Sequence, residues 1–307
     1  MTELKPWIAE IQMTQILAKK LIEDQFPTLS PVTIKDLGSG WDNTAYCVND
    51  AYVFRFPRRK EAVALMDSEY GVLPTLAELL PLVIPDPKFY GKPTEDFKWP
   101  FIGYLMLPGK TACSTDLSDK ERIRSTKTIA EFLSALHSFD TNKASQLGAG
   151  PDVFKRLKCC KYSRKMIARF EKIKKLGYID NFHPYLDQAG IYSEIEYNGP
   201  EILVHGDLYA RHLLVDEQNN ISGVIDWGDM HIGIPASDFS IAHSFLPSQS
   251  HDTFRNTYGE IDESTWKLAR LAAIHSMSHT ITYGHDIKDD NLIRESLVGL
   301  KYLKGSL

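Results

Sequence analysis

The stretch HGDLYARH, residues 205–212, constrains the fold of this chain more than any other. It follows the apolar run EILV and precedes LLVD, a turn and the run SGVIDWGD. Short apolar runs bounded by turn residues are typical of strands. A metalloprotease helix would need two His one helical turn apart with a Glu beside the first, and these two His are seven positions apart. The pattern therefore predicts a loop between two strands that carries His205, Asp207 and His212, with Asp226 at the end of a third strand.

The composition is typical of a globular protein, with 43% hydrophobic and 24% charged residues among 307. This length can bury a sizeable core in one domain or in two lobes. The net charge of −5 shows no basic excess, so we expect no nucleic-acid partner. No apolar run approaches the ~18 residues of a membrane span, so we expect no membrane partner. Four Cys without C-x-x-C spacing favour free thiols, and we expect a monomer in a reducing cytoplasm.

The hydrophobic pattern divides the chain into a strand-rich first third and a helix-rich remainder. In the first part, helical spacing over about 6–26 and 60–80 alternates with strand patterns at VTIKDLGSG, TAYCVN, YVFRFP, KFYG and PFIGYLML. After Gly109, a strand pair is expected around 202–226. Helices are expected near 118–138, 151–176, 235–247, 263–285 and 289–304. This pattern predicts an α+β fold of two lobes, residues 1–106 and 107–307, and unlike lobes of this kind form a ligand cleft between them.

One strand of the first lobe carries a charge that needs an explanation. In YVFRFPRR, Tyr52, Phe54 and Phe56 alternate onto one face and Arg55 lies on the other. A cation in an apolar strand is either a solvated edge charge or a phosphate clamp held by a carboxylate. Glu69, fourteen positions later on the next predicted helix, is a fitting partner. A guanidinium there would offer a two-pronged fork in place of the point charge of a Lys.

The 205–212 stretch also fits the catalytic-loop pattern of protein kinases, H-R-D-x-x-x-x-N, in which the Asp receives the substrate proton and the Asn holds a metal. Asp207 and His212 keep the required interval of five positions. Gly206 replaces the Arg of that pattern, and His212 replaces the Asn. Asp226, in IDWG, stands where the metal-binding Asp of D-F-G would stand. Two carboxylates brought to one metal site explain this layout better than chance does.

Taken together, these segments resemble the aminoglycoside phosphotransferase family, whose fold is similar to that of protein kinases. The resemblance is carried over about 37–240, in order, by GSGWDNTAY, FRFPRR, Glu69, GYLMLPG, LHSFD, LVHGDLYARHLLVD, GVIDWGD and PASDFS. FRFPRR together with His212 is similar to the macrolide phosphotransferases, whereas GWDNTAY is similar to the branch that acts on the 2''-hydroxyl of aminoglycosides. The resemblance implies a bilobal protein-kinase-like fold, with an antiparallel sheet lobe for the nucleotide and a larger, mostly helical lobe for the acceptor.

The resemblance implies roles on the nucleotide side of the cleft. Arg55, paired with Glu69, would hold the α- and β-phosphates of ATP or GTP. Ser39 and Gly40, in the Gly-Ser-Gly turn, would cover these phosphates, because glycine turns let the backbone approach a ligand closely. The purine base would lie against the backbone of Met106, Leu107 and Gly109.

The resemblance also implies roles around the catalytic loop. Asp207 would be the base, or would position the acceptor hydroxyl, and Asp226 would bind Mg²⁺. His212 would take the second metal-ligand position. Because Mg²⁺ prefers oxygen ligands, this His either ligates weakly or only hydrogen-bonds a metal-bound water or phosphate. Its protonation predicts a loss of activity below about pH 6. Asp238 would brace the loop, and His205 would do similar structural work or would simply be a satisfied buried His.

The acceptor is less constrained, because phosphoryl transfer needs positioning and charge neutralisation more than special acceptor chemistry. Asp229 follows Asp226 closely enough to meet an acceptor amine, and Tyr258 and Trp266 are candidate aromatic contacts. We expect an antibiotic O-phosphotransferase whose acceptor is an aminoglycoside, with a macrolide as the alternative. A kinase of a small metabolite (choline, methylthioribose or homoserine) and a non-catalytic kinase-like nucleotide-binding module are further alternatives.

Overall fold

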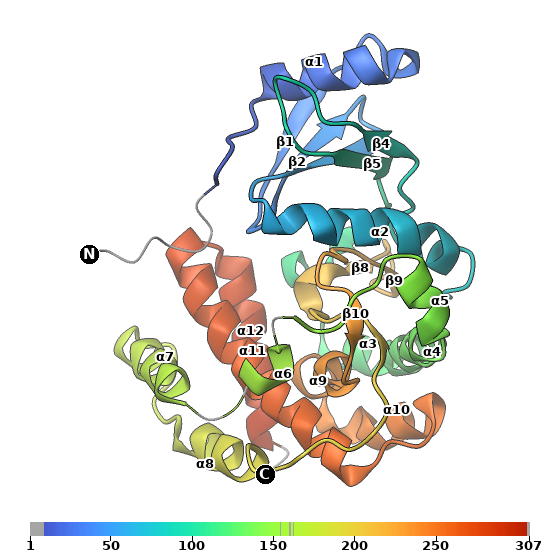
Figure 1. The fold of residues 1–307 in the computed structure, drawn as a ribbon. Helices are drawn as coiled ribbons and strands as arrows, with labels where there is room; N and C mark the ends of the chain where they lie inside the picture. The colour runs from blue at the N-terminus through green and yellow to red at the C-terminus, as the bar shows by residue number, and fades with distance from the viewer. Residues whose placement is uncertain (1–8, 154, 160, 162, 306–307) are drawn as a thin grey trace.

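The computed structural model describes residues 9–153, 155–159, 161 and 163–305. A small lobe built on a sheet lies above a larger, mostly helical lobe (Figure 1). The sheet of the small lobe is antiparallel, with strand order β1-β2-β3-β5-β4. Its strands are β1 (Ile34–Ser39), β2 (Asn43–Val48), β3 (Tyr52–Pro57), β4 (Phe89–Gly91) and β5 (Phe101–Leu105). The α+β class and the strand-rich first third are therefore confirmed.

The two faces of this sheet are covered by different helices. Phe54 and Phe56 pack with Phe101 and with residues of α1 (Gln15–Gln25) in a core cluster of the small lobe. Arg55 points to the opposite face, toward α2 (Glu61–Ala77), as the alternation along the strand predicts. The apolar face of the sheet therefore packs against α1, and the buried cation Arg55 lies on the face toward α2.

The first helix is shorter than predicted. The expected helix over 6–26 begins only at Gln15, because the hydroxyl of Thr14 accepts a hydrogen bond from the N–H of Leu17 (3.2 Å) and caps the first turn. Residues 9–14 are not helical, and the part of the prediction that covers 1–8 lies outside the described residues. The second prediction, over 60–80, corresponds to α2.

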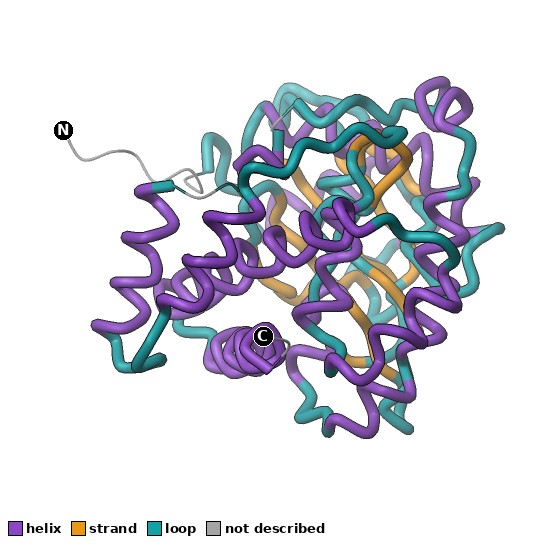
Figure 2. The backbone as a smooth tube through the Cα atoms, turned by 90° about the horizontal axis from the view of Figure 1, so that it is seen from below, coloured by secondary structure: helices purple, strands orange, loops and turns teal. Residues whose placement is uncertain are grey.

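The large lobe is mostly helical, and seen from below its helices lie in front of the strands (Figure 2). The helices predicted over 235–247, 263–285 and 289–304 are confirmed as α9, α11 and α12, whose bounds are given below. The expected helix over 118–138 is two helices that meet at Ser125, and that over 151–176 is α6 and α7, with Ser163 capping α7. The helices are α3 (Asp119–Arg124), α4 (Thr126–His137), α5 (Thr141–Gln146), α6 (Arg156–Cys159), α7 (Arg164–Lys175), α8 (His183–Tyr192), α9 (Ala236–Ser244), α10 (His251–Tyr258), α11 (Glu263–Ile287) and α12 (Asp290–Gly305).

The strands of the large lobe differ from the predicted pair. β7 (Ile202–Val204) pairs with β10 (His231–Gly233), a strand that the sequence pattern does not predict. β8 (Leu213–Val215) instead pairs with β6 (Lys110–Thr111) and β9 (Ile221–Val224). The 205–212 stretch is therefore the loop that carries the chain from one small sheet to the other.

The chain passes between the lobes over residues 106–109, where we place the lobe boundary. Gly109 has a φ of +111°, and a Cβ there would lie 2.6 Å from the carbonyl oxygen of Val215. Only glycine fits this close approach to β8. Val72, Leu73 and Leu76 of α2 pack into the core of the large lobe, so α2 joins the two lobes.

Two further features bear on the environment expected from the sequence. In the described part of the chain, no helix combines the length and the apolar character that a membrane crossing requires. The thiols of Cys47 and Cys113 are free and buried. The side chains of Cys159 and Cys160 lie outside the described residues, so the expectation of free thiols there stays a prediction.

Candidate active site

A buried ion pair connects the sheet of the small lobe to the cleft. Arg55 on β3 donates from one guanidinium nitrogen to Glu69 on α2, and the two side chains are 8% and 1% exposed. Burial opposes the charge of Arg55, but attraction to Glu69 holds the pKa of the guanidinium above its usual range. Burial raises the pKa of Glu69 to about 7, and Arg55 opposes this shift. The predicted partner of Arg55 is therefore in place.

Asp226 links this pair to the catalytic loop. Its φ of +63° is left-handed, a conformation that Asp tolerates better than most residues and that is frequent at functional sites. Its Oδ1 lies 3.2 Å from Nη2 of Arg55, and its Oδ2 lies 3.2 Å from Nε2 of His212. Burial alone would raise the pKa of Asp226, but the His212 and Arg55 cations hold it below the usual range.

His212 lies between two acceptors. Its Nδ1 is 2.8 Å from the carbonyl oxygen of Asp207, and its Nε2 faces the Asp226 carboxylate. Both partners only accept, so both ring nitrogens carry protons. Burial opposes this charge, but Asp226 raises the pKa of His212 to about 9. The expected loss of activity below about pH 6 assumed an ordinary pKa for this His, whereas its pairing with Asp226 raises that pKa, so the pH dependence of activity stays a prediction.

The backbone of the loop is held from behind by Asp238 of α9. Its two carboxylate oxygens accept the N–H groups of His205 (2.7 Å) and Gly206 (2.8 Å). Nε2 of His137, on α4, lies 3.2 Å from the same carboxylate, a contact that the sequence did not predict. The ring of His205 is fully buried, with Nε2 3.1 Å from the carbonyl oxygen of Ile225. His205 is thus a satisfied buried His.

The Gly at position 206, where the kinase pattern has Arg, has a steric explanation. Its φ is +85°, and a Cβ there would lie 2.3 Å from the carbonyl oxygen of Asp229. Any larger residue would push the loop and the Asp226–Asp229 turn apart. The side chain of Asp207, next in sequence, is 45% exposed. Burial around it raises the pKa of Asp207 to about 7, opposed by His212 and supported by Asp229 and Asp226.

Asp229, three residues after Asp226, already has a cationic partner. Its carboxylate is ion-paired with Arg156 of α6, which also donates to Asp152 (2.9 Å). Sequence reasoning missed Arg156, because it belongs to no motif and lies in a segment expected to be one uninterrupted helix. The structure therefore brings together Asp207, Asp226 and Asp229, but pairs Asp229 within the chain.

Two predicted acceptor contacts, Tyr258 and Trp266, already have partners within the large lobe, and their contact with an acceptor stays a prediction. The hydroxyl of Tyr258 lies 3.1 Å from Nδ1 of His137, and its ring packs on Phe239 inside the large lobe. Trp266 packs on His243, with ring centroids 4.4 Å apart. The unpredicted α10 packs this part of the chain against α4 rather than toward the catalytic loop.

The predicted contacts to the phosphates lie in an exposed hairpin turn. The Ser39 hydroxyl lies 3.1 Å from that of Thr44, and the Gly40 N–H donates to the carbonyl of Asn43 (2.9 Å). That N–H is therefore engaged within the hairpin. Trp41, at its tip, reaches the other lobe and contacts α11. Its ring centroid lies 5.8 Å from that of His279 and 5.9 Å from that of Tyr283, a contact that the sequence did not predict.

The predicted purine contacts differ in the backbone groups they offer. The N–H of Met106 donates to the carbonyl of Ala51 (2.8 Å), so it extends the strand pairing beyond β5. In the described part of the chain, the backbone of Leu107 makes no hydrogen bond. Leu107 thus offers a backbone N–H that is not engaged in the sheet, unlike that of Met106, and Gly109 lies beyond it against β8.

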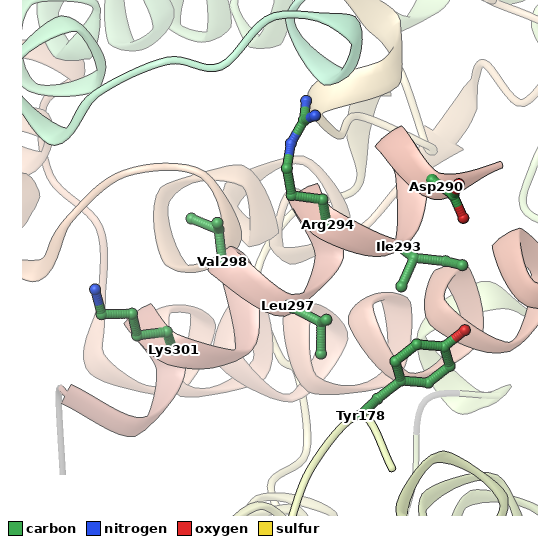
Figure 3. A pocket seen from close by; sticks show the side chains of 7 residues that line it. All are labelled: Tyr178, Asp290, Ile293, Arg294, Leu297, Val298 and Lys301. Atoms are coloured by element: carbon green, nitrogen blue, oxygen red, sulfur yellow. The ribbon is translucent and has the colours of Figure 1, made fainter. Parts of the chain in front are cut away.

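A separate hollow of about 450 Å³ lies along α12 (Figure 3). Its lining includes Tyr178, Asp290, Arg294 and Lys301. None of the residues predicted from the motifs lines it. The catalytic geometry lies instead at the junction of the lobes, around Asp226.

Comparison with known proteins is consistent with this geometry. The sequence profile of the phosphotransferase enzyme family matches residues 33–274, most of the chain. The chain belongs to this family. It is a kinase-type phosphotransferase, and its resemblance to the aminoglycoside phosphotransferases is confirmed. The uncharacterized protein YcbJ of Bacillus subtilis (strain 168) is 25% identical over 228 residues, 70% of either chain.

Solved structures of this phosphotransferase's relatives share its bilobal fold. The GDP and kanamycin complex of APH(2'')-IIIa superposes with a TM-score of 0.67 at 22% identity, over 95% of this chain and 99% of that one. Macrolide 2'-phosphotransferase type I superposes with a TM-score of 0.60 at 19% identity, over 93% and 97%. At these identities the likeness establishes the fold, and the predicted kinase-like architecture is confirmed.

Proposed function

We propose that this phosphotransferase moves the γ-phosphoryl group of ATP or GTP to a hydroxyl of a small-molecule acceptor, with Asp207 as the residue that receives the proton. The observation that carries the proposal is the position of Asp207. Its half-exposed carboxylate lies beside a chain of paired charges that runs through His212 and Asp226 to Arg55. Partial burial and the neighbouring carboxylates of Asp229 and Asp226 raise the pKa of Asp207, which favours its acceptance of a proton.

In the proposed reaction, the acceptor oxygen forms a bond to the γ-phosphorus as the bond from that phosphorus to the β–γ bridging oxygen breaks. The bridging oxygen keeps the electron pair and leaves with the nucleoside diphosphate. The hydroxyl proton passes to Oδ of Asp207. Arg55, held by Glu69, would fix the leaving phosphates, because a positioned guanidinium matches phosphate geometry with two N–H donors.

The donor set around Asp226 fits Mg²⁺ in part. Mg²⁺ is usually held by one or two carboxylates together with substrate phosphates and waters, and the half-exposed Asp226 carboxylate supplies such a ligand. His212 fits less well, because its Nε2 faces Asp226 and would have to lose its proton before it could ligate. No group of three or more metal-binding side chains occurs in the described residues. When bound, Mg²⁺ would neutralise charge on the phosphates.

The acceptor class that we propose first is an aminoglycoside, with a macrolide second. Relatives of similar fold were solved with kanamycin, gentamicin and streptomycin. The TM-scores of the APH(2'')-IIIa structures, 0.67 and 0.68, exceed those of the macrolide phosphotransferases, 0.60 and 0.58. The APH(2'')-IIa complexes, at 0.58, fall in the range of the macrolide enzymes, so the likeness covers both acceptor classes and does not indicate the hydroxyl.

The test is a coupled nucleotide-turnover assay with Mg²⁺, run with ATP and GTP separately. The acceptors are kanamycin-type aminoglycosides, 14- and 15-membered macrolides and small amino-alcohol metabolites. We expect acceptor-dependent turnover with an aminoglycoside that is lost in Asp207→Ala. Turnover with a metabolite alone would replace the antibiotic assignment. Tight nucleotide binding without turnover on any acceptor would favour a non-catalytic binding module.

A further inference from the structure

Arg156 lies between two carboxylates at the edge of the catalytic loop. One end of its guanidinium is paired with Asp229, and Nη1 lies 2.9 Å from Oδ1 of Asp152. The backbone N–H of Arg156 also donates to Oδ2 of Asp152 (2.6 Å). The Arg156 side chain is 19% exposed, whereas that of Asp229 is 37% exposed. Asp152, which precedes α6, thus holds Arg156 at the start of that helix, and the other end of the guanidinium contacts Asp229.

Asp229 is fixed close to the reacting centre. Its carbonyl oxygen packs directly on Gly206, which precedes Asp207, and it faces Nδ1 of His231 (2.7 Å). His231 begins β10, which pairs with the strand leading into the catalytic loop. The charges of Asp229 and Arg156 both act on Asp207. A ligand whose hydroxyl lies at Asp207 therefore brings its neighbouring atoms to Asp229.

The segment that carries Arg156 is also anchored here. The N–H of Ile232, on β10, donates to the carbonyl of Gly150 (2.7 Å), and Pro151 bridges to the same residue. The reach of Arg156 to Asp229 is therefore set by contacts to the strand next to the catalytic loop. Arg156 therefore lies beside the catalytic loop, on the side where we place the acceptor.

The balance of charge in this cluster allows an exchange of cations. Asp152 and Asp229 share the Arg156 guanidinium, and Nε2 of His231 lies 4.0 Å from Oδ2 of Asp152. If another cation formed an ion pair with Asp229, Arg156 would keep its side-chain and backbone contacts to Asp152. The exchange would break one partly exposed ion pair and form another, and pairs of this kind contribute little each.

We propose that Arg156 is a specificity-determining residue that competes with an ammonium group of the acceptor for Asp229. The proposal rests on the proposed function, because it places the acceptor hydroxyl at Asp207. An acceptor with an amine close to its reacting hydroxyl has to displace Arg156 from Asp229. An acceptor without a charge there meets no such competition. Arg156 thereby weakens the binding of cationic acceptors relative to neutral ones of the same shape.

The experiment compares the full-length chain with Arg156→Gln by titration calorimetry in the presence of GDP. The two probes are kanamycin and fully N-acetylated kanamycin, which keeps the hydroxyls and lacks the ammonium groups. We expect the Kd of kanamycin to fall about fivefold in Arg156→Gln, as an ion pair of this exposure allows. The Kd values of the acetylated probe and of GDP should stay within about twofold.

Two variants separate competition from a loss of structure. Arg156→Lys keeps a competing cation, so it should retain the weaker kanamycin binding. Arg156→Gln combined with Asp229→Asn should lose the gain, because the contested carboxylate is removed. Thermal unfolding of each variant checks that α6 and the loop remain folded.

The inference is overturned if kanamycin binding is unchanged or absent in Arg156→Gln, if both probes gain equally, or if the gain survives Asp229→Asn. These outcomes are distinct from failure of the proposed function, which is measured by turnover. Binding can change as expected while no acceptor is phosphorylated, and that result would reject the reaction and keep the competition at Asp229.

Discussion

The ion pair of Arg55 and Glu69 in the small lobe is buried, whereas the three carboxylates of Asp207, Asp226 and Asp229 in the large lobe are about half exposed. Arg55 and Glu69 are 8% and 1% exposed, but Asp207 and Asp229 are 45% and 37% exposed. Buried, fixed charges need no rearrangement when charge develops on a phosphate. Exposed charges can exchange partners with a ligand. We propose that the buried pair serves the constant substrate, the nucleotide, and that the exposed carboxylates can change partners when a ligand binds.

The largest expected effect is on Asp207, where the two sides meet. Asp207→Asn keeps the size of the side chain but removes the proton acceptor, so we expect kcat to fall about 10²- to 10⁴-fold. The Kd of the nucleotide should change less than about threefold, since Arg55 and Asp226 are untouched. Steady-state turnover and nucleotide titration measure both. A kcat within tenfold of the native enzyme would show that Asp207 only positions the acceptor.

On the nucleotide side, Glu69→Ala should affect stability most. It leaves Arg55 buried without its main partner, which costs about 3–5 kcal/mol when one member of a buried pair is removed. Denaturant unfolding of the nucleotide-free protein measures this loss. Glu69→Gln, which keeps a hydrogen-bond acceptor, is the matched control and should lose less. Equal losses in both variants would mean that packing, and not charge, matters at this position.

Loss of the proton from His212 should make the folded protein less stable at alkaline pH. The folded-state pKa of His212, about 9, lies above the ordinary 6.5. Its contribution to the free energy of unfolding is therefore complete below about pH 6.5 and is lost as the pH rises through about 9. We expect His212→Asn to lose about 1–2 kcal/mol of unfolding free energy at pH 7, allowing for the half-exposed Asp226. The difference from the native protein should shrink by pH 10. A difference that is constant with pH would exclude a charged His212.

The smallest effect concerns Trp41, through which the glycine-turn hairpin contacts α11. Trp41→Ala removes two ring contacts, each worth about 0.5–1.5 kcal/mol, so the KM for nucleotide should rise a few-fold. Trp41→Phe keeps a ring and is the matched control. If nucleotide KM is unchanged while acceptor KM rises, Trp41 belongs to the acceptor side, and the division between the two sides has to be redrawn.

The sequence predicted the nucleotide side better than the acceptor side. Arg55 and Glu69 could be paired from strand alternation and helix spacing, and Asp207, His212 and Asp226 from fixed intervals in a loop. Their geometry depends mainly on short stretches of chain and on one sheet. The pKa of His212 could not be predicted in the same way, because it depends on Asp226, which approaches it only through the turn after β9.

The acceptor side depends on contacts between segments far apart in sequence. The packing of Tyr258 on Phe239 and of Trp266 on His243 was not predicted, and Arg156 was missed because its partner Asp229 lies 73 positions away. Trp41 meets His279 and Tyr283 across the two lobes in the same manner. The hydrophobic periodicity of a short segment does not predict such contacts.

By itself, the sequence determined the α+β class, the two unlike lobes and the family, and it led to the proposal of which residues handle phosphate. These follow from alternation, spacing and motif, which are properties of short segments. Only the tertiary structure decided which cation faces which carboxylate: Arg156 at Asp229, and His212 at Asp226. The physical reason is that electrostatic interactions depend on distance in space and on burial, and both are set when the lobes and their helices pack together.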